Sequence, residues 1–175
     1  ETSRNPEAAE RIRREGQEVY GDREPTAADY SALAYTRAVV QETMRLYPPI
    51  WGLIRVASKP DVIAGKEIKP GDRVVLFAYG AHHNPKFWDE PEAFRPERWM
   101  AGAAKKQVKY SYLPFGGGKR SCIGGAMSQV ENTLALSLLL RRFRPQYVGP
   151  TPAGINATVT RTPKGGLPFE LDEWR

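Results

Sequence analysis

The sequence predicts an α+β fold, in which helices and short strands occupy separate stretches of the chain. Apolar residues recur at three- and four-residue steps in residues 5–20, 30–47 and 123–142, which is the periodicity of amphipathic helices. Runs rich in β-branched and aromatic residues lie between the second and third helices and again after the third. Because strands and helices do not alternate one by one, the order favours α+β over repeated βαβ units.

The composition is that of one soluble globular domain over residues 1–175. Hydrophobic residues make up 41% and charged residues 26%, which is ordinary, and a chain of this length can bury a core. No apolar run approaches membrane-spanning length, no signal-peptide pattern opens the chain, and the single cysteine rules out an internal disulfide. These features predict a cytoplasmic protein without a membrane segment. The net charge of +6 allows an acidic partner, but no nucleic-acid motif occurs, so we expect no nucleic-acid partner.

The first and third helices differ in how much apolar surface they carry. The helix at residues 5–20 has Pro6 in its first turn, Gly21 after its end and a thin apolar face, so it is predicted to lie on the surface. A short helical turn is expected at Thr26–Asp29. The helix at residues 123–142 has an apolar stripe and a nearly all-apolar end, which predicts burial. The stripe consists of Ile123, Met127, Val130, Leu134 and Leu138.

Strands are predicted in two groups. The first group comprises Trp51–Ala57, a short hairpin over residues 61–69, and the mostly apolar run Arg73–Ala78. The second group is in the tail, where residues 155–160 and 167–171 are expected to form two strands joined through a Pro-Lys-Gly-Gly turn.

Residues 79–110 are predicted to be mostly irregular, which is unusually long for a connection within a compact domain. His82 and His83 are adjacent there. Neighbouring side chains point in different directions and no carboxylate or thiol stands at ligand spacing, so local hydrogen bonding is expected rather than a metal site. On the second helix, Glu42 and Arg45 lie one turn apart on one face, which by itself indicates no more than a surface ion pair.

The single cysteine lies in the segment Phe115–Gly125, which is rich in glycine and precedes the third helix. Glycines allow the backbone to fold tightly beneath a flat ligand. A helix N-terminus beside Cys122 favours a negatively charged sulfur, and a thiolate is the axial ligand in one class of haem proteins. A lone cysteine is otherwise most often a small buried apolar residue.

Five positions of this segment resemble the haem-binding loop of the cytochrome P450 family: Phe115, Gly118, Arg120, Cys122 and Gly124. Two upstream motifs, Glu42-x-x-Arg45 and Phe94-x-Pro-Glu-Arg98-Trp99, are similar to motifs of the same family and occur in the same order. The resemblance runs over essentially the whole chain and is to the C-terminal portion of a bacterial-type P450 domain. It implies helices, a small mixed sheet, a long meander, the cysteine loop, a buried helix and a C-terminal β-hairpin.

The resemblance implies three sets of site residues. Cys122 would bind the iron of haem b through its thiolate, and Phe115, Gly118, Arg120 and Gly124 would contact the haem. Of these, Arg120 would pair with a haem propionate, for which Arg55 is a second candidate. Glu42, Arg45 and Arg98 would form a buried structural charge cluster, in which loss of one partner leaves a buried charge unpaired. The residues expected to border a hydrophobic substrate are Ile50, Trp51, Leu53, Ile54, Val159 and Thr160.

The function implied is that of a haem-thiolate monooxygenase, which oxidises a hydrophobic small molecule with O₂ and electrons from a ferredoxin- or flavodoxin-type donor. Two alternatives remain open: a peroxygenase or rearranging haem-thiolate enzyme, and a non-catalytic haem-binding piece. Lysines in or beside the segment leading to the cysteine loop predict a basic surface for the donor or simply a solvated loop. They are Lys105, Lys106, Lys109 and Lys119.

The resemblance also implies what lies outside these residues. The family's distal helix, with its acid–threonine pair for oxygen activation, has no counterpart in this sequence. We therefore expect a fragment, a truncation or one half of a split enzyme, whose partner is the N-terminal part of the same P450. On its own, residues 1–175 are expected to be inactive as a monooxygenase, and soluble only with that partner or self-associated.

Overall fold

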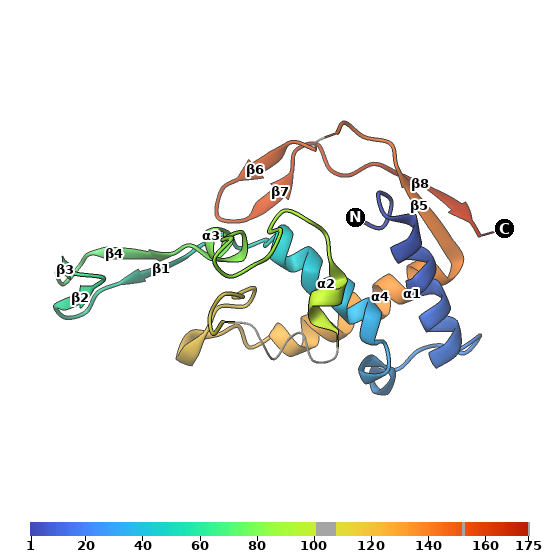
Figure 1. The fold of residues 1–175 in the computed structure, drawn as a ribbon, viewed down its shortest axis with the longest axis horizontal. Helices are drawn as coiled ribbons and strands as arrows, with labels where there is room; N and C mark the ends of the chain where they lie inside the picture. The colour runs from blue at the N-terminus through green and yellow to red at the C-terminus, as the bar shows by residue number, and fades with distance from the viewer. Residues whose placement is uncertain (101–107, 152, 175) are drawn as a thin grey trace.

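In the computed structural model, which describes residues 1–100, 108–151 and 153–174, three helices form the centre of the protein (Figure 1). They are α1 (Pro6–Val19), α2 (Ala34–Leu46) and α4 (Gly125–Arg142), and both α1 and α2 pack against α4. Their shared core consists of Ala8, Ala9, Ile12, Tyr35, Val39 and Leu140. The short antiparallel sheets lie outside this bundle, so the predicted α+β class is confirmed.

Helix α1 begins with Pro6 at its first turn, as predicted, and it also fixes the start of α2. The carboxylate of Glu15 on α1 accepts hydrogen bonds from the backbone N–H groups of Tyr35 and Thr36, at 2.6 and 2.8 Å. A free N–H at a helix start needs such a partner, so one helix caps the other. The predicted turn at Thr26–Asp29 is a 3₁₀ helix over Ala27–Ser31.

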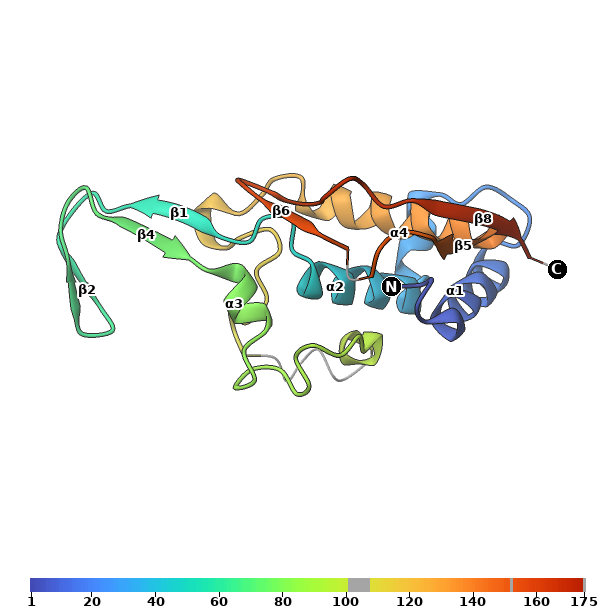
Figure 2. The same ribbon diagram turned by 90° about the horizontal axis from the view of Figure 1, so that it is seen from above.

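Strands β1 (Leu53–Val56) and β4 (Arg73–Leu76) pair antiparallel and form an arm that extends away from the helices, with the hairpin of β2 (Asp61–Ile63) and β3 (Lys66–Ile68) at its tip (Figures 1 and 2). These strands were predicted, but the last one ends earlier than expected. The chain turns at Phe77 into the short helix α3 (Ala78–His82). Helix α3 packs against α2 and begins the irregular segment.

The irregular segment contains α3 and a 3₁₀ turn at Pro96–Trp99, and its remaining described residues are turns and loops. Its packing depends on aromatic rings rather than on a sheet. Trp88 and Trp99 are buried with Ala38 of α2, and Tyr112 packs against them. The ring centroids of Trp99 and Tyr112 are 4.4 Å apart.

The predicted pairing of the tail strands is wrong. Strand β8 (Phe169–Glu173) pairs with β5 (Phe143–Tyr147), a strand that the sequence did not predict, and β6 (Ile155–Ala157) pairs with β7 (Arg161–Pro163). Pro145 concealed β5, because proline cannot donate to a ladder and is disfavoured in central strands. Strand β5 pairs on one side only within the described residues, so the missing N–H group is tolerated.

The predicted stripe on the third helix is not its buried face. Helix α4 starts at Gly125, Met127 is 65% exposed, and the fully buried side chains are Thr133, Ser137 and Leu140. Ser137 faces α1, where the two helices approach closely. A Cβ atom on Gly16 of α1 would lie 2.9 Å from Ser137 Oγ. Within the described residues, no helix combines the length and apolar character needed to cross a membrane.

Candidate functional site

The cysteine loop is a tight turn closed by one backbone hydrogen bond. The N–H group of Cys122 donates to the carbonyl oxygen of Phe115 at 2.9 Å. Gly116 and Gly118 have φ angles of +74° and +69°, in the left-handed region that favours glycine. Helix α4 starts at Gly125, so the cysteine precedes the helix by one turn of loop and its side chain is exposed.

Beside this loop the structure has a hollow of about 640 Å³. Its walls come from four parts of the chain besides the N-terminus, and they are mostly apolar. Its lining residues are Val39, Val40, Thr43 and Met44 of α2; Pro49, Ile50 and Leu53 before and in β1; Leu113, Pro114, Phe115, Gly116, Arg120 and Cys122 of the loop; Ser128, Asn132 and Leu136 of α4; and Glu1 and Thr2. A cysteine and an arginine, Cys122 and Arg120, therefore line the same apolar space.

The loop fits a flat prosthetic group bound through sulfur. A Cβ atom placed on Gly124 would meet only Cys122 Sγ within 4 Å, at 3.9 Å, so the glycine leaves the space next to the sulfur clear. A Cβ atom on Gly125 would lie 3.1 Å from Phe115 Cγ, which shows how closely the ring packs against the start of α4. The donor set of one thiol, apolar walls and a cation is the set that a haem with its propionates needs.

The other predicted haem and substrate residues divide into two groups. Phe115, Arg120 and Cys122 line the hollow, and so do Ile50 and Leu53. The remaining ones do not: Gly118, Gly124, Arg55, Trp51, Ile54, Val159 and Thr160 are not among the lining residues. The guanidinium of Arg55 donates to the carbonyl of Ile54 at 3.0 Å.

The tail hairpin nonetheless lies beside the segment that leads into β1. Trp51 Nε1 donates to the carbonyl of Thr158 at 2.8 Å, and the N–H group of Arg161 donates to the carbonyl of Pro49 at 2.7 Å. The two stretches predicted to border a substrate are thus joined by hydrogen bonds, although Val159 itself is 82% exposed.

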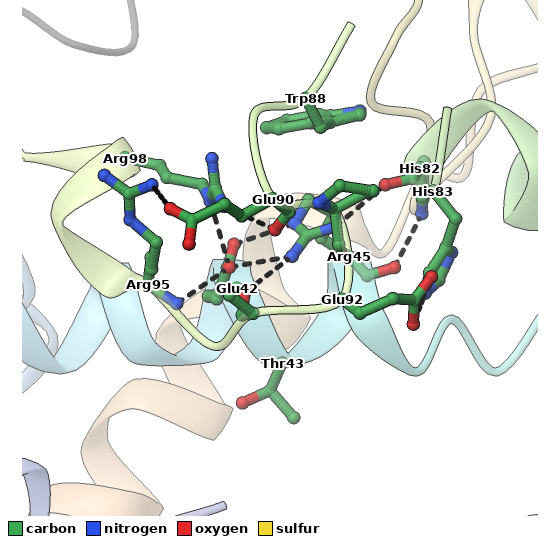
Figure 3. A network of polar contacts seen from close by, with 12 residues as sticks. Glu42, Thr43, Arg45, His82, His83, Trp88, Glu90, Glu92, Arg95 and Arg98 are labelled. Atoms are coloured by element: carbon green, nitrogen blue, oxygen red, sulfur yellow. Dashed lines mark hydrogen bonds and ion pairs between the residues drawn. The ribbon is translucent and has the colours of Figure 1, made fainter. Parts of the chain in front are cut away.

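The three residues of the predicted charge cluster lie together, and the Glu42 carboxylate is at their centre (Figure 3). It accepts from Arg45 Nε and Nη2 at 2.9 and 2.8 Å, from Arg98 Nε at 3.3 Å, from the N–H group of Arg95 at 3.0 Å, and from Trp99 Nε1 at 2.8 Å. The side chains of Glu42 and Arg45 are fully buried, and that of Arg98 is 11% exposed.

Arg45 uses every guanidinium donor. Besides its two bonds to Glu42, it donates to three backbone carbonyl groups of the irregular segment: those of His82 and Pro91 at 2.9 and 2.6 Å, and that of Ala93 at 3.1 Å. A guanidinium group has five N–H donors in a fixed plane, so the group is completely satisfied. The cluster is therefore a structural junction between α2 and the irregular segment.

The electrostatics of the cluster keep Glu42 ionised. Burial acts to raise the pKa of Glu42, but the hydrogen bonds from Arg45, Arg95 and Trp99 outweigh it and hold the pKa below its ordinary value. Burial also lowers the pKa of Arg98, and the charge of Glu42 opposes that shift. The cluster thus has the chemistry of a neutralised buried ion pair rather than of a proton-transfer site.

Sequence reasoning missed three partners of this junction. Trp99 and the backbone of Arg95 bind the Glu42 carboxylate directly, and His82 is fully buried behind Arg45. The motif around Arg98 contains Trp99, so its indole N–H was a visible signal. Nothing in the sequence indicates which of the two adjacent histidines points inward.

Of the four lysines predicted for a donor-binding surface, Lys109 and Lys119 are exposed, whereas Lys105 and Lys106 lie outside the described residues. Lys109 Nζ is 5.0 Å from the centroid of the Tyr110 ring. Lys119 lies in the 3₁₀ turn Gly118–Arg120, which is separated from Cys122 by Ser121 alone.

Comparison with known proteins places this geometry in a family. The profile described as Cytochrome P450 matches residues 1–167, and the chain therefore belongs to the cytochrome P450 family. Membership implies a haem iron held by a cysteine thiolate.

The chain is similar to proteins from distant organisms. Cyclooctat-9-en-7-ol 5-monooxygenase of Streptomyces melanosporofaciens is 36% identical over 140 residues, which cover 80% of this chain and 30% of that protein. Thromboxane-A synthase of Sus scrofa is 36% identical over 169 residues, covering 93% and 31%. The crystal structure titled cytochrome P450DA heme domain superposes with a TM-score of 0.90 and 27% identity, covering 99% of this chain and 39% of that one. The chain spans about a third of the length of each.

Proposed function

We propose that residues 1–175 are the C-terminal, thiolate-bearing portion of a cytochrome P450 monooxygenase that oxidises a hydrophobic small molecule with O₂ and electrons from a redox partner. The observation that carries this proposal is the position of Cys122, whose exposed side chain lines the apolar hollow beside Phe115 and Arg120. In this reading the chain holds haem b, which supplies the oxygen activation when bound.

Each residue of the loop has a distinct task. Cys122 would hold the haem iron through its thiolate sulfur, and Gly124 leaves room beside that sulfur. Phe115, packed against the start of α4, would line the haem pocket near the sulfur, and Arg120 would pair with a haem carboxylate. The hydrogen bond from the N–H group of Cys122 to the carbonyl of Phe115 closes the loop that carries the sulfur.

The substrate and the partners follow from the walls of the same site. Ile50 and Leu53 are apolar lining residues, which favours a hydrophobic substrate. Exposed Lys109 and Lys119 suit an acidic ferredoxin- or flavodoxin-type donor. We assign the rest of the distal wall to the N-terminal portion of the same P450, and a single reduced cysteine suits a cytoplasmic setting.

The test is the carbon monoxide spectrum of the ferrous full-length protein that contains this chain. We expect the band that marks thiolate ligation, and we expect Cys122→Ser to abolish it while Ser121→Ala leaves it in place. Retention of the band in Cys122→Ser would refute the assignment of the ligand.

A second function is favoured by one comparison. The similarity to thromboxane-A synthase is as high as that to a monooxygenase, so a rearranging enzyme or a peroxygenase, which need no electron donor, is the alternative. Product formation from hydrophobic substrates by the full-length protein separates the two. A monooxygenase requires O₂ with a reduced ferredoxin system, whereas the alternative turns over a peroxide without either.

A further inference from the structure

His82, the last residue of α3, is a fully buried side chain with both ring nitrogens engaged. Nδ1 lies 3.2 Å from the carbonyl oxygen of Arg45, and Nε2 lies 2.7 Å from the backbone nitrogen of Leu113. A backbone carbonyl only accepts and a backbone N–H only donates. The ring must therefore carry its proton on Nδ1 and present Nε2 as an acceptor, which is a neutral tautomer.

The surroundings of His82 keep it neutral. Burial lowers the pKa of His82 to about 4; the hydrogen bond to the carbonyl of Arg45 opposes this shift, and the charge of the Arg45 guanidinium adds to it. The ring of Tyr112 lies 5.2 Å away on a third side. A second proton on the ring would place an N–H group against the N–H group of Leu113, so protonation would break the contact.

The contact with Leu113 leads directly to the cysteine. The carbonyl of Leu113 accepts from the N–H group of Gly116 at 3.2 Å, and the carbonyl of Phe115 accepts from the N–H group of Cys122 at 2.9 Å. Two backbone hydrogen bonds within one tight loop thus connect Leu113 to the residue that carries the sulfur. His82 therefore joins the start of this loop to the charge cluster, beside Tyr112, whose hydroxyl donates to the carbonyl of Gln41 on α2 at 3.2 Å.

We propose that His82 is a positioning residue for the cysteine loop: its neutral imidazole fixes Leu113 relative to α2 and so holds Cys122 where it can bind the haem iron. The inference rests on the proposed function, because it assumes that Cys122 is the ligand. His82 contacts neither the sulfur nor the hollow, so its role is indirect.

The neighbouring histidine provides a matched comparison. His83 is also largely buried, with a side chain 9% exposed, and its ring stacks on Tyr79 with centroids 4.0 Å apart. Its Nδ1 lies 2.9 Å from the carbonyl oxygen of Tyr79, which belongs to α3, so this contact stays within the helix and its C-cap. Both histidines lie at the end of α3 with most of their side-chain surface buried, but of the two only His82 hydrogen-bonds to the loop.

The experiment compares three variants of the haem-loaded full-length protein: His82→Leu, His82→Gln and His83→Gln. Leucine fills the site without an acceptor, whereas the amide oxygen of glutamine can accept from Leu113. The first readout is the ratio of the thiolate-marked carbon monoxide adduct to the form without thiolate. The second is hydrogen exchange at the Leu113 amide, which does not depend on enzyme activity.

For His82→Leu we expect the ratio to fall about tenfold and the Leu113 amide to exchange about tenfold faster, the scale of one lost buried hydrogen bond. His82→Gln should recover most of both values, and His83→Gln should match the wild type. Equal losses in His82→Leu and His83→Gln would reduce His82 to a packing role and overturn the inference.

Two further outcomes separate this inference from the proposed function. If the wild type shows the thiolate band, Cys122→Ser abolishes it and His82→Leu retains it, the role of His82 is wrong and the ligand assignment stands. If His82→Leu does not fold, the inference is tested by Leu113 amide exchange in the wild type and in His82→Gln. A Leu113 amide that exchanges without protection in the wild type would overturn the inference.

Discussion

Removal of the Glu42 carboxylate tests whether the charge cluster holds the irregular segment. In Glu42→Ala, Arg45 remains 0% exposed without a counter-charge, and the N–H groups of Arg95 and Trp99 lose their acceptor. Breaking a buried ion pair costs roughly 3–5 kcal/mol, because a buried charge is left uncompensated. The orphaned N–H groups would each add about 1–3 kcal/mol if they stayed dry. Water can enter the space left by the side chain, so we expect a total of roughly 3–5 kcal/mol, not the sum.

The assay is urea unfolding of the haem-loaded full-length protein, with the double variant Glu42→Ala/Arg45→Ala measured beside the singles. The double variant should cost little more than Glu42→Ala alone, since both residues belong to one network. Glu10→Ala is the matched control. Glu10 pairs with Arg13 and Arg14 at 2.9 Å on the surface of α1, and hydrogen bonds from these arginines lower its pKa to about 2. An exposed pair of this kind contributes about 0.2–1 kcal/mol.

The reasoning is refuted if Glu42→Ala costs no more than the Glu10 control, or if the losses for Glu42 and Arg45 add. Either result would mean that water reaches the cluster and that the Arg45 guanidinium is solvated although its side chain is buried in the fold. A large loss of stability in the Glu10 control would show that the surface pairs on α1 contribute more than expected.

Two further predictions concern pH and the space beside the sulfur. The pKa of His82 in the folded protein is about 4, below its ordinary value near 6.5, so its contribution to stability is complete above pH 6.5 and declines by up to about 3 kcal/mol as the pH falls toward 4. Urea titrations at a series of pH values should show a shallower decline in unfolding free energy for His82→Gln than for the wild type. Equal slopes would contradict this prediction. Gly124 has a φ of −81°, which any residue adopts, so a substitution there tests the space beside the sulfur without straining the backbone. Gly124→Leu should crowd Cys122 Sγ and lower haem occupancy more than Gly124→Ala does. Full occupancy of Gly124→Leu, measured by pyridine haemochrome, would show that the space is not needed.

The sequence predicts those parts of the fold in which local pattern and packing agree. Helices α1 and α2 have clear periodicity, and the spacing of Glu42 and Arg45 by three residues places both on one helical face. The motif that contains Arg98 indicates the third member of the cluster only through the family resemblance, because the two segments are more than fifty residues apart. No local rule connects them.

The features that were missed depend on contacts that leave no periodic signal. Strand β5 is defined by pairing with β8, and Pro145 contradicts its local propensity. The inner face of α4 is set by the close approach of α1 at Gly16, where Ser137 fits and a larger apolar residue would not. Tyr20 donates to or accepts from Ser137 at 2.8 Å across this contact, so a polar pair replaces the expected apolar one.

One guanidinium group satisfies several backbone carbonyl groups of the irregular segment. A segment without ladder hydrogen bonds must satisfy its buried carbonyl groups in another way. Arg45 does so for His82, Pro91 and Ala93, while its charge is balanced by Glu42. Lysine offers three donors from a single point, whereas the planar fork of arginine reaches carbonyl groups on two sides at once. The backbone carbonyl of Arg45 also accepts a hydrogen bond from His82, which in turn accepts from the N–H group of Leu113. Arg45 therefore contacts both the irregular segment and the histidine that we propose positions the cysteine loop.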